Sequence, residues 1–161
     1  MRFMSVVLAS SLLGVLGAQT IGLNVFPEYH AKPDQEMLDM AGKVEASKVI
    51  VYLSEMKNRY LKMTPKRQAE FQKHFQDVLA KNIAKLSPSQ RQKRLNAIEK
   101  ALAVRVKNVD NLKEEVDTEY DYLEHWESTL KSKTFYEDLQ KNGFVPASVT
   151  QKQKARKQLS H

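Results

Sequence analysis

A repeated four-residue pattern, Lys, apolar, hydroxyl, Pro, most constrains how this chain can fold. It occurs as Lys62 to Pro65 (KMTP) and again, 23 residues later, as Lys85 to Pro88 (KLSP). In each copy the hydroxyl can accept a hydrogen bond from an exposed backbone N–H at a helix start, and proline suits the first helical position. The two copies therefore predict the end of one helix, a complete second helix, and the start of a third.

Hydrophobic periodicity predicts helices on both sides of this repeat. A first helix is expected to open at Pro33-Asp34, with Asp34 as its cap, and to continue to Met63. Within it, Val49 to Leu53 could form a buried strand, but its flanks lack turn residues and favour helix. The second helix should span about Pro65 to Lys85, because its apolar residues recur every three or four positions on one stripe.

The third helix is expected to start at Pro88, and its apolar rhythm continues for about 45 residues, which would be roughly 65 Å as one helix. Asn108 to Asn111 is the natural place for a break, but the pattern alone leaves both a bent hairpin and one protruding helix open. Thr134 can cap a short helix from Phe135 to Asn142, which Gly143 would end. The predicted fold class is all-α, with four to five helices, one of them long or bent.

The N-terminus has the pattern of a secretory signal peptide. Arg2 precedes an apolar run from Val6 to Leu16, and small residues follow it. We therefore expect a secreted protein whose mature chain has no transmembrane segment, with an uncleaved N-terminal anchor as the alternative. The predicted divisions are a signal peptide (1–17), an extended arm (18–33), a helical domain (34–145) and a basic flexible tail (146–161).

Charge is distributed unevenly along the chain, whose formal net charge is +7. Basic residues concentrate between Lys57 and Lys107, and the stretch from Asp110 to Glu127 holds eight acids. If the helices pack side by side, these blocks neutralise each other. The alternative is a basic face for anionic lipid headgroups or for an acidic protein partner.

The residue types argue against catalysis and against metal or cofactor sites. The chain has no cysteine and only five glycines, which excludes thiolate chemistry and leaves little material for a nucleophile turn or a phosphate loop. Glu70 with His74, and Asp121 with His125, are spaced for a shared helix face, but neither pair has a visible third ligand. Nucleic acid is the least favoured partner, because the phenylalanines lie on the stripe that a core must use. We expect no enzyme, no cofactor and no metal.

Two segments resemble known families of exported helical proteins. Asn58 to Pro65, followed by Ala69 to Phe75, resembles the nematode fatty-acid- and retinol-binding family in its tyrosine-lysine segment, capped helix start and later phenylalanine. That family commonly has proline after the last phenylalanine, whereas Gln76 stands here. Leu86 to Gln90 resembles the LTxxQ motif of the bacterial periplasmic Spy and CpxP chaperones, with serine for threonine. Both resemblances imply binding rather than catalysis.

The function expected from sequence is non-enzymatic binding of a small hydrophobic ligand such as a fatty acid. Methionines and long apolar stripes could line an adaptable cavity, although a lining residue and a core residue look identical in sequence. The alternative is a protein-interaction or chaperone-like module with a basic surface. The candidate lining residues are Tyr52, Met56, Phe71, Phe75, Leu79, Ile83, Leu102 and Val106. The candidate headgroup contacts are Arg59, Lys62, Lys81 and Lys85.

Overall fold

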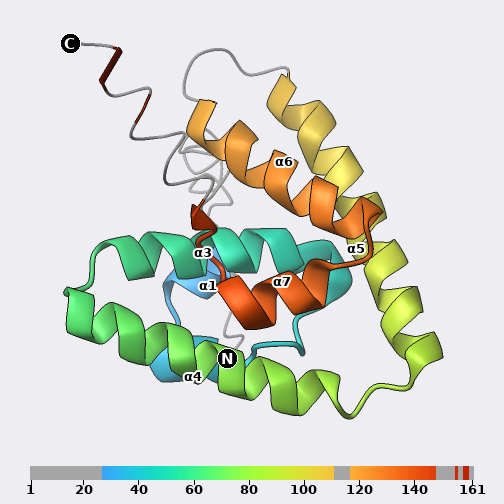
Figure 1. Ribbon diagram of the computed structural model, residues 1–161, viewed down its shortest axis with the longest axis horizontal. Helices are drawn as coiled ribbons and strands as arrows, with labels where there is room; N and C mark the ends of the chain where they lie inside the picture. The colour runs from blue at the N-terminus through green and yellow to red at the C-terminus, as the bar shows by residue number, and fades with distance from the viewer. Residues whose placement is uncertain (1–26, 111–116, 148–154, 156–157, 160–161) are drawn as a thin grey trace, which may run out of the picture.

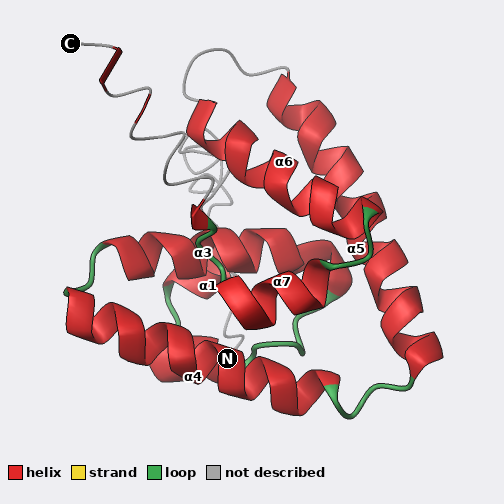
Figure 2. Cartoon of the chain, viewed as in Figure 1, coloured by secondary structure: helices red, strands yellow, loops and turns green. Residues whose placement is uncertain are grey.

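A computed structural model describes residues 27–110, 117–147, 155 and 158–159, and all the regular structure in these residues is helical (Figures 1 and 2). The helices are α1 (Pro27–His30), α2 (Asp34–Asp39), the 3₁₀ turn η3 (Ala46–Lys48), α3 (Val49–Leu61), α4 (Pro65–Ile83), α5 (Pro88–Asp110), α6 (Asp117–Lys131) and α7 (Phe135–Asn142). The predicted all-α fold is therefore confirmed. The expected signal peptide and most of the expected tail lie outside the described residues. Within the described residues, no helix is long and apolar enough to span a bilayer.

Both copies of the repeated pattern begin helices in the predicted way. The Thr64 hydroxyl accepts from the backbone N–H of Arg67 at 3.4 Å. At the second copy, the Gln90 N–H donates to the Ser87 hydroxyl at 3.1 Å, and the Ser87 N–H donates back to the Gln90 side chain at 2.9 Å. The second copy is therefore a complete capping box, and the first is a single, longer cap bond.

The repeat also joins each new helix to the preceding one. The Gln68 side chain donates to the carbonyl of Tyr60 at 3.0 Å, and the Arg91 guanidinium donates to the carbonyl of Ile83 at 3.4 Å. Each bond runs back eight residues, from the first turns of the new helix to the last turn of the old one. The α3–α4 and α4–α5 joints are therefore built on one plan.

The predicted first helix is interrupted, which corrects the expectation of one helix from Asp34 to Met63. Helix α2 ends at Asp39, and the chain turns through Gly42, whose φ is +80°. A Cβ atom on Gly42 would lie 3.2 Å from Cβ of Asn82, whose side chain donates to the carbonyl of Ala41 at 2.8 Å. The turn packs tightly on α4, and this contact with a residue 40 positions away has no local sequence signal.

Two smaller expectations also differ. The segment expected as an extended arm contains the single-turn helix α1, and Pro33, not Asp34, occupies the cap position of α2. Asp34 instead pairs with Arg59.

Of the two alternatives for the helix that begins at Pro88, the structure has the hairpin. Helix α5 ends at Asp110, and α6 runs back against it as a hairpin (Figure 1). Asn111, part of the predicted break, lies outside the described residues.

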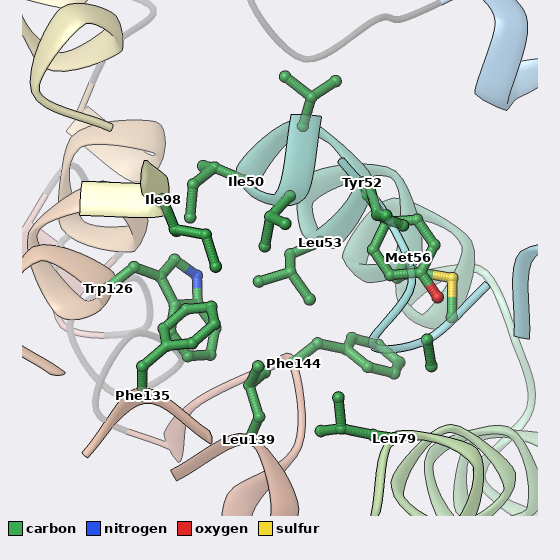
Figure 3. Close-up of a cluster of buried hydrophobic side chains, with 14 of the residues drawn as sticks. Ile50, Tyr52, Leu53, Met56, Leu79, Ile98, Trp126, Phe135, Leu139 and Phe144 are labelled. Atoms are coloured by element: carbon green, nitrogen blue, oxygen red, sulfur yellow. The ribbon is translucent and has the colours of Figure 1, made fainter. Parts of the chain in front are cut away.

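The core lies where α3 meets α4, α5 and α7 (Figures 1 and 3). Phe144, just after α7, is fully buried and meets the rings of Tyr60, Phe71 and Phe75 edge-on at 4.9–5.8 Å. Gly143 has φ +72° and ψ −165°, a backbone conformation that favours glycine, and it lies beside the flexible end of the Gln72 side chain of α4. Trp126 is fully buried and packs on the opposite side of this core (Figure 3).

Candidate functional site

The predicted lining residues form part of the hydrophobic core. Seven of the eight are at most 3% exposed, and Val106 is half-buried against the same cluster. The small, partly open void beside Tyr52, Phe75 and Leu79 has a volume of about 20 Å³, which is room for about one water molecule. Pockets that hold drug-sized ligands measure several hundred cubic ångströms. In this conformation the apolar faces of the helices pack against one another and fill the core.

The polar end of Tyr52 is used within the core. Its hydroxyl donates to the carbonyl of Met37 at 2.6 Å. Burial raises the pKa of Tyr52 well above its ordinary value. This hydroxyl therefore ties α3 to α2 as a neutral donor.

The four predicted headgroup cations lie in two separate places. Arg59 and Lys62 lie at the end of α3, whereas Lys81 and Lys85 lie at the far end of α4. The 19 residues of α4 span about 28 Å at 1.5 Å per residue. These cations therefore cannot bind one headgroup together.

Arg59 is engaged by groups of its own chain. Its guanidinium donates to Glu55 at 2.9 Å, to Asp34 at 2.9 Å, and to the carbonyls of Tyr29 and Lys32 at 2.8 and 2.7 Å. An open groove of about 530 Å³ lies beside it, between residues 30–34 and the end of α3. Since the donors of Arg59 are already used, its main role is to hold residues 29–34 on α3.

A basic surface surrounds the α4–α5 joint. Between Asp77 and Glu99 the chain has five basic residues and no acid. The turn at Gly42 brings Lys43 to the same end of α4. We call the four exposed lysines here the basic joint: Lys43, Lys81, Lys85 and Lys93. Of these four, only Lys81 and Lys85 were predicted as contacts. The acid-free interval was also a signal for Lys93 on α5, whereas the place of Lys43 depends on the Gly42 turn.

The described part of the acidic block, on α6, lies away from the basic joint. Because α6 runs back along α5, its last residue, Lys131, lies near the middle of α5. A hydrogen bond to Glu127 raises the pKa of Lys131, and Glu99 of α5 adds to this more weakly. Helix α6 therefore lies along the second half of α5. It does not cover the segment from Pro88 to Ile98, which borders the basic joint.

The two acid–histidine pairs expected from spacing lie on α4 and α6, and Glu70 and His74 border one open groove. His125 binds Asp138 of α7, with 2.8 Å between Nε2 and Oδ2, rather than forming a local pair with Asp121. His30 lies 3.6 Å from Glu55. No group of three potential metal ligands occurs among the residues that the structure describes.

Exposed apolar residues are scattered. In the described parts of the chain, the large apolar side chains that are exposed are Leu61, Val104 and Leu159, on three different segments. Single residues of this kind are ordinary for a soluble surface, whereas a chaperone surface needs a contiguous patch.

Comparison with known proteins gives one match. The family model DUF1104, described as a protein of unknown function, matches residues 28–120. No curated protein and no solved structure matches the chain.

Proposed function

The chain belongs to the DUF1104 family of proteins of unknown function, and from its geometry we propose that it is a secreted, non-enzymatic helical module that binds a protein partner through the basic joint. The observation that carries this proposal is the basic joint itself. Lys43, Lys81, Lys85 and Lys93 are exposed, and none forms an ion pair within the described residues. Clustered charge of one sign, held on a rigid scaffold, favours a partner of the opposite charge.

The scaffold under these lysines is well fixed. The Ser87–Gln90 capping box, the Asn82 bond to Ala41 and a bond from Arg94 to the carbonyl of Val44 hold α4, α5 and the Gly42 turn together. A preorganised surface loses little entropy when a partner binds.

Binding of a fatty acid is the second candidate. A ligand of that size would have to displace core side chains, because the void in the core has a volume of only about 20 Å³. The open groove beside Arg59 is large enough, but its lining is mostly polar or charged: His30, Lys32, Asp34, Glu55, Asn58, Arg59 and Lys62, with Pro33 and Leu61. The groove is open, whereas pockets for ligands of that size enclose most of the ligand surface.

Site-specific photo-crosslinking in the native host tests the proposal. A photo-crosslinking residue at exposed Ser89, within the joint, should trap a protein partner, and one at exposed Ser128 on α6 should not. The double variant Lys81→Gln, Lys85→Gln should remove the Ser89 adduct, whereas the matched variant Lys66→Gln, Lys141→Gln should keep it.

Titration of the purified mature chain with a fluorescent fatty acid completes the test. We expect no saturable signal at micromolar protein. A saturable signal that oleate displaces, together with no adduct at Ser89, would replace the proposed function with lipid binding.

A further inference from the structure

The first turns of α5 carry charges of the wrong sign for a helix start. The N-terminal end of a helix dipole is positive and is stabilised by acids. Helix α5 has no acid in its first turn and carries Arg91, Lys93 and Arg94 in its first two turns. A helix start that departs from this charge preference without an evident structural gain often marks a functional site.

Neither arginine has a carboxylate partner in the part of the chain that the structure describes. One nitrogen of each guanidinium donates to a backbone carbonyl, Arg91 to Ile83 at 3.4 Å and Arg94 to Val44. The Nε atoms of both are buried and lack any hydrogen-bond partner among the described residues. Unmet donors on half-buried cations are costly, which favours an anion beside them.

A third unmet donor comes from another helix. Tyr136 of α7 is 5% exposed, and its hydroxyl has no hydrogen bond of ordinary geometry within the described residues. Burial raises the pKa of Tyr136, and the guanidinium groups of Arg94 and Arg91 oppose that rise, so both groups lie close to the hydroxyl. Arg94 and Tyr136 also border the void of about 20 Å³.

We infer that Arg91, Arg94 and Tyr136 form a carboxylate-binding subsite, which takes an acidic side chain of the partner protein. This inference rests on the proposed function and names the chemistry of the partner at the basic joint. A planar guanidinium fork matches a carboxylate, and a phenol can donate a further hydrogen bond to it. The arginines are half-buried rather than enclosed, so a side chain can reach them from the lysine-bearing surface.

A membrane or a nucleic acid fits this subsite less well. The exposed large apolar residues of the described chain lie at positions 61, 104 and 159, away from the joint, so no apolar anchor flanks the arginines. Nucleic-acid surfaces add exposed aromatic rings for base stacking, and Tyr136 is buried.

Fluorescence anisotropy with a labelled acidic peptide, four Gly-Glu repeats, tests the subsite on the mature chain. We expect Arg91→Gln, Arg94→Gln to weaken binding at least tenfold. The matched variant Lys66→Gln, Lys141→Gln removes the same charge elsewhere and should weaken it no more than about twofold. Arg91→Lys, Arg94→Lys should give an intermediate loss, because it keeps the charge and loses the fork.

Tyr136→Phe keeps the test decisive even if the arginine variants fail to fold. This substitution removes only a hydroxyl that lacks a hydrogen bond of ordinary geometry among the described residues, so we expect an unchanged thermal midpoint and binding about threefold weaker. In the wild type, the Nε–H signals of Arg91 and Arg94 should shift on peptide addition in NMR spectra. Equal losses in the arginine variant and its charge-matched control, or unshifted Nε–H signals, would overturn the subsite.

Competition by small anions distinguishes a site for a carboxylate from a site for a phosphate. Acetate should compete with the peptide at lower concentration than inorganic phosphate does, and the reverse order would overturn the carboxylate assignment.

The proposed function can fail separately from the carboxylate subsite. If Arg91→Gln, Arg94→Gln still gives the Ser89 adduct, the function stands and the subsite fails. If the peptide binds at the arginines but no adduct forms, the subsite stands and the protein-partner function fails.

Discussion

Arg59 shows at the scale of one residue how a surface-type side chain becomes structural. It is 14% exposed, and its partner Glu55 is 6% exposed. Replacing Arg59 with Met would leave Glu55 and Asp34 without this cation and would remove its hydrogen bonds to the carbonyls of segment 29–32. We expect a loss of about 2–4 kcal/mol in the free energy of unfolding, measured by urea denaturation.

Lys62 provides the control for Arg59, since it lies one turn away and is exposed. Lys62→Met should change stability by less than about 0.5 kcal/mol. An equal effect of the two substitutions would contradict the structural role of Arg59.

The sequence indicates that Arg59 and Lys62 lie close together, but it does not separate their roles. Both are basic residues at the end of one helix, and both were predicted to contact a headgroup. What distinguishes Arg59 is the segment 29–34, which folds back over it. Such a partner lies 25 or more residues away along the chain and is set by the tertiary fold.

Tyr52 predicts how stability depends on alkaline pH. Because burial raises its pKa in the folded state, the folded chain keeps this proton at a pH where the unfolded chain, with a phenol pKa of about 10, has released it. The unfolded state then binds fewer protons, so the contribution of Tyr52 to stability is constant below about pH 10 and falls above it, by up to about 1.4 kcal/mol per pH unit.

Tyr52→Phe is the control for this dependence. It should be less stable at pH 7, because the carbonyl of Met37 loses its donor, but its stability should fall less steeply above about pH 10. Urea denaturation at a series of pH values measures both slopes. Parallel curves for the two proteins would rule out Tyr52 as the source.

At the scale of elements, the two helix joints should differ in strength. Ser87→Ala removes one half of a reciprocal capping box and should lower stability by about 1 kcal/mol. Thr64→Ala removes a single cap bond of 3.4 Å, so we expect a smaller loss, about 0.5 kcal/mol. Urea denaturation of both variants gives the order. A larger loss at Thr64 would contradict it.

Sequence reasoning succeeded where an element is specified by its own residues. Helix α4 has a capped start and a clear apolar stripe, and α7 has a terminal glycine. Both were predicted within two residues of their ends, although the predicted cap bond of Thr134 at α7 does not form. The stretch between Asp39 and Val49 was missed, because its helical spacing continues through a turn. Gly42 was the one local signal, and only the contact with Asn82 explains why the chain bends there.

At the scale of the whole molecule, the same periodicity predicted the apolar residues correctly but could not say what they surround. Phe71, Phe75 and Leu79 do lie on one face and are 1% exposed. A cavity and a filled core need the same stripes, and only side-chain packing across helices separates them. The carboxylate subsite was missed for a similar reason, since Tyr136 is 42 residues from Arg94 and shows no charge pattern.

The filled core makes a final prediction about apolar ligands. Leu79 borders the small void together with Leu53 and Phe75, so Leu79→Ala would merge the space of the lost side chain with it. We expect a loss of about 3–5 kcal/mol in stability, the usual range for a buried leucine truncated to alanine, and binding of benzene to the enlarged cavity. Wild type should bind neither benzene nor oleate, because its interior has no room for them. Calorimetric titration of both proteins measures this binding. Stronger oleate binding by the wild type than by the variant would mean that the helices separate to admit a ligand, which the close packing of the core argues against.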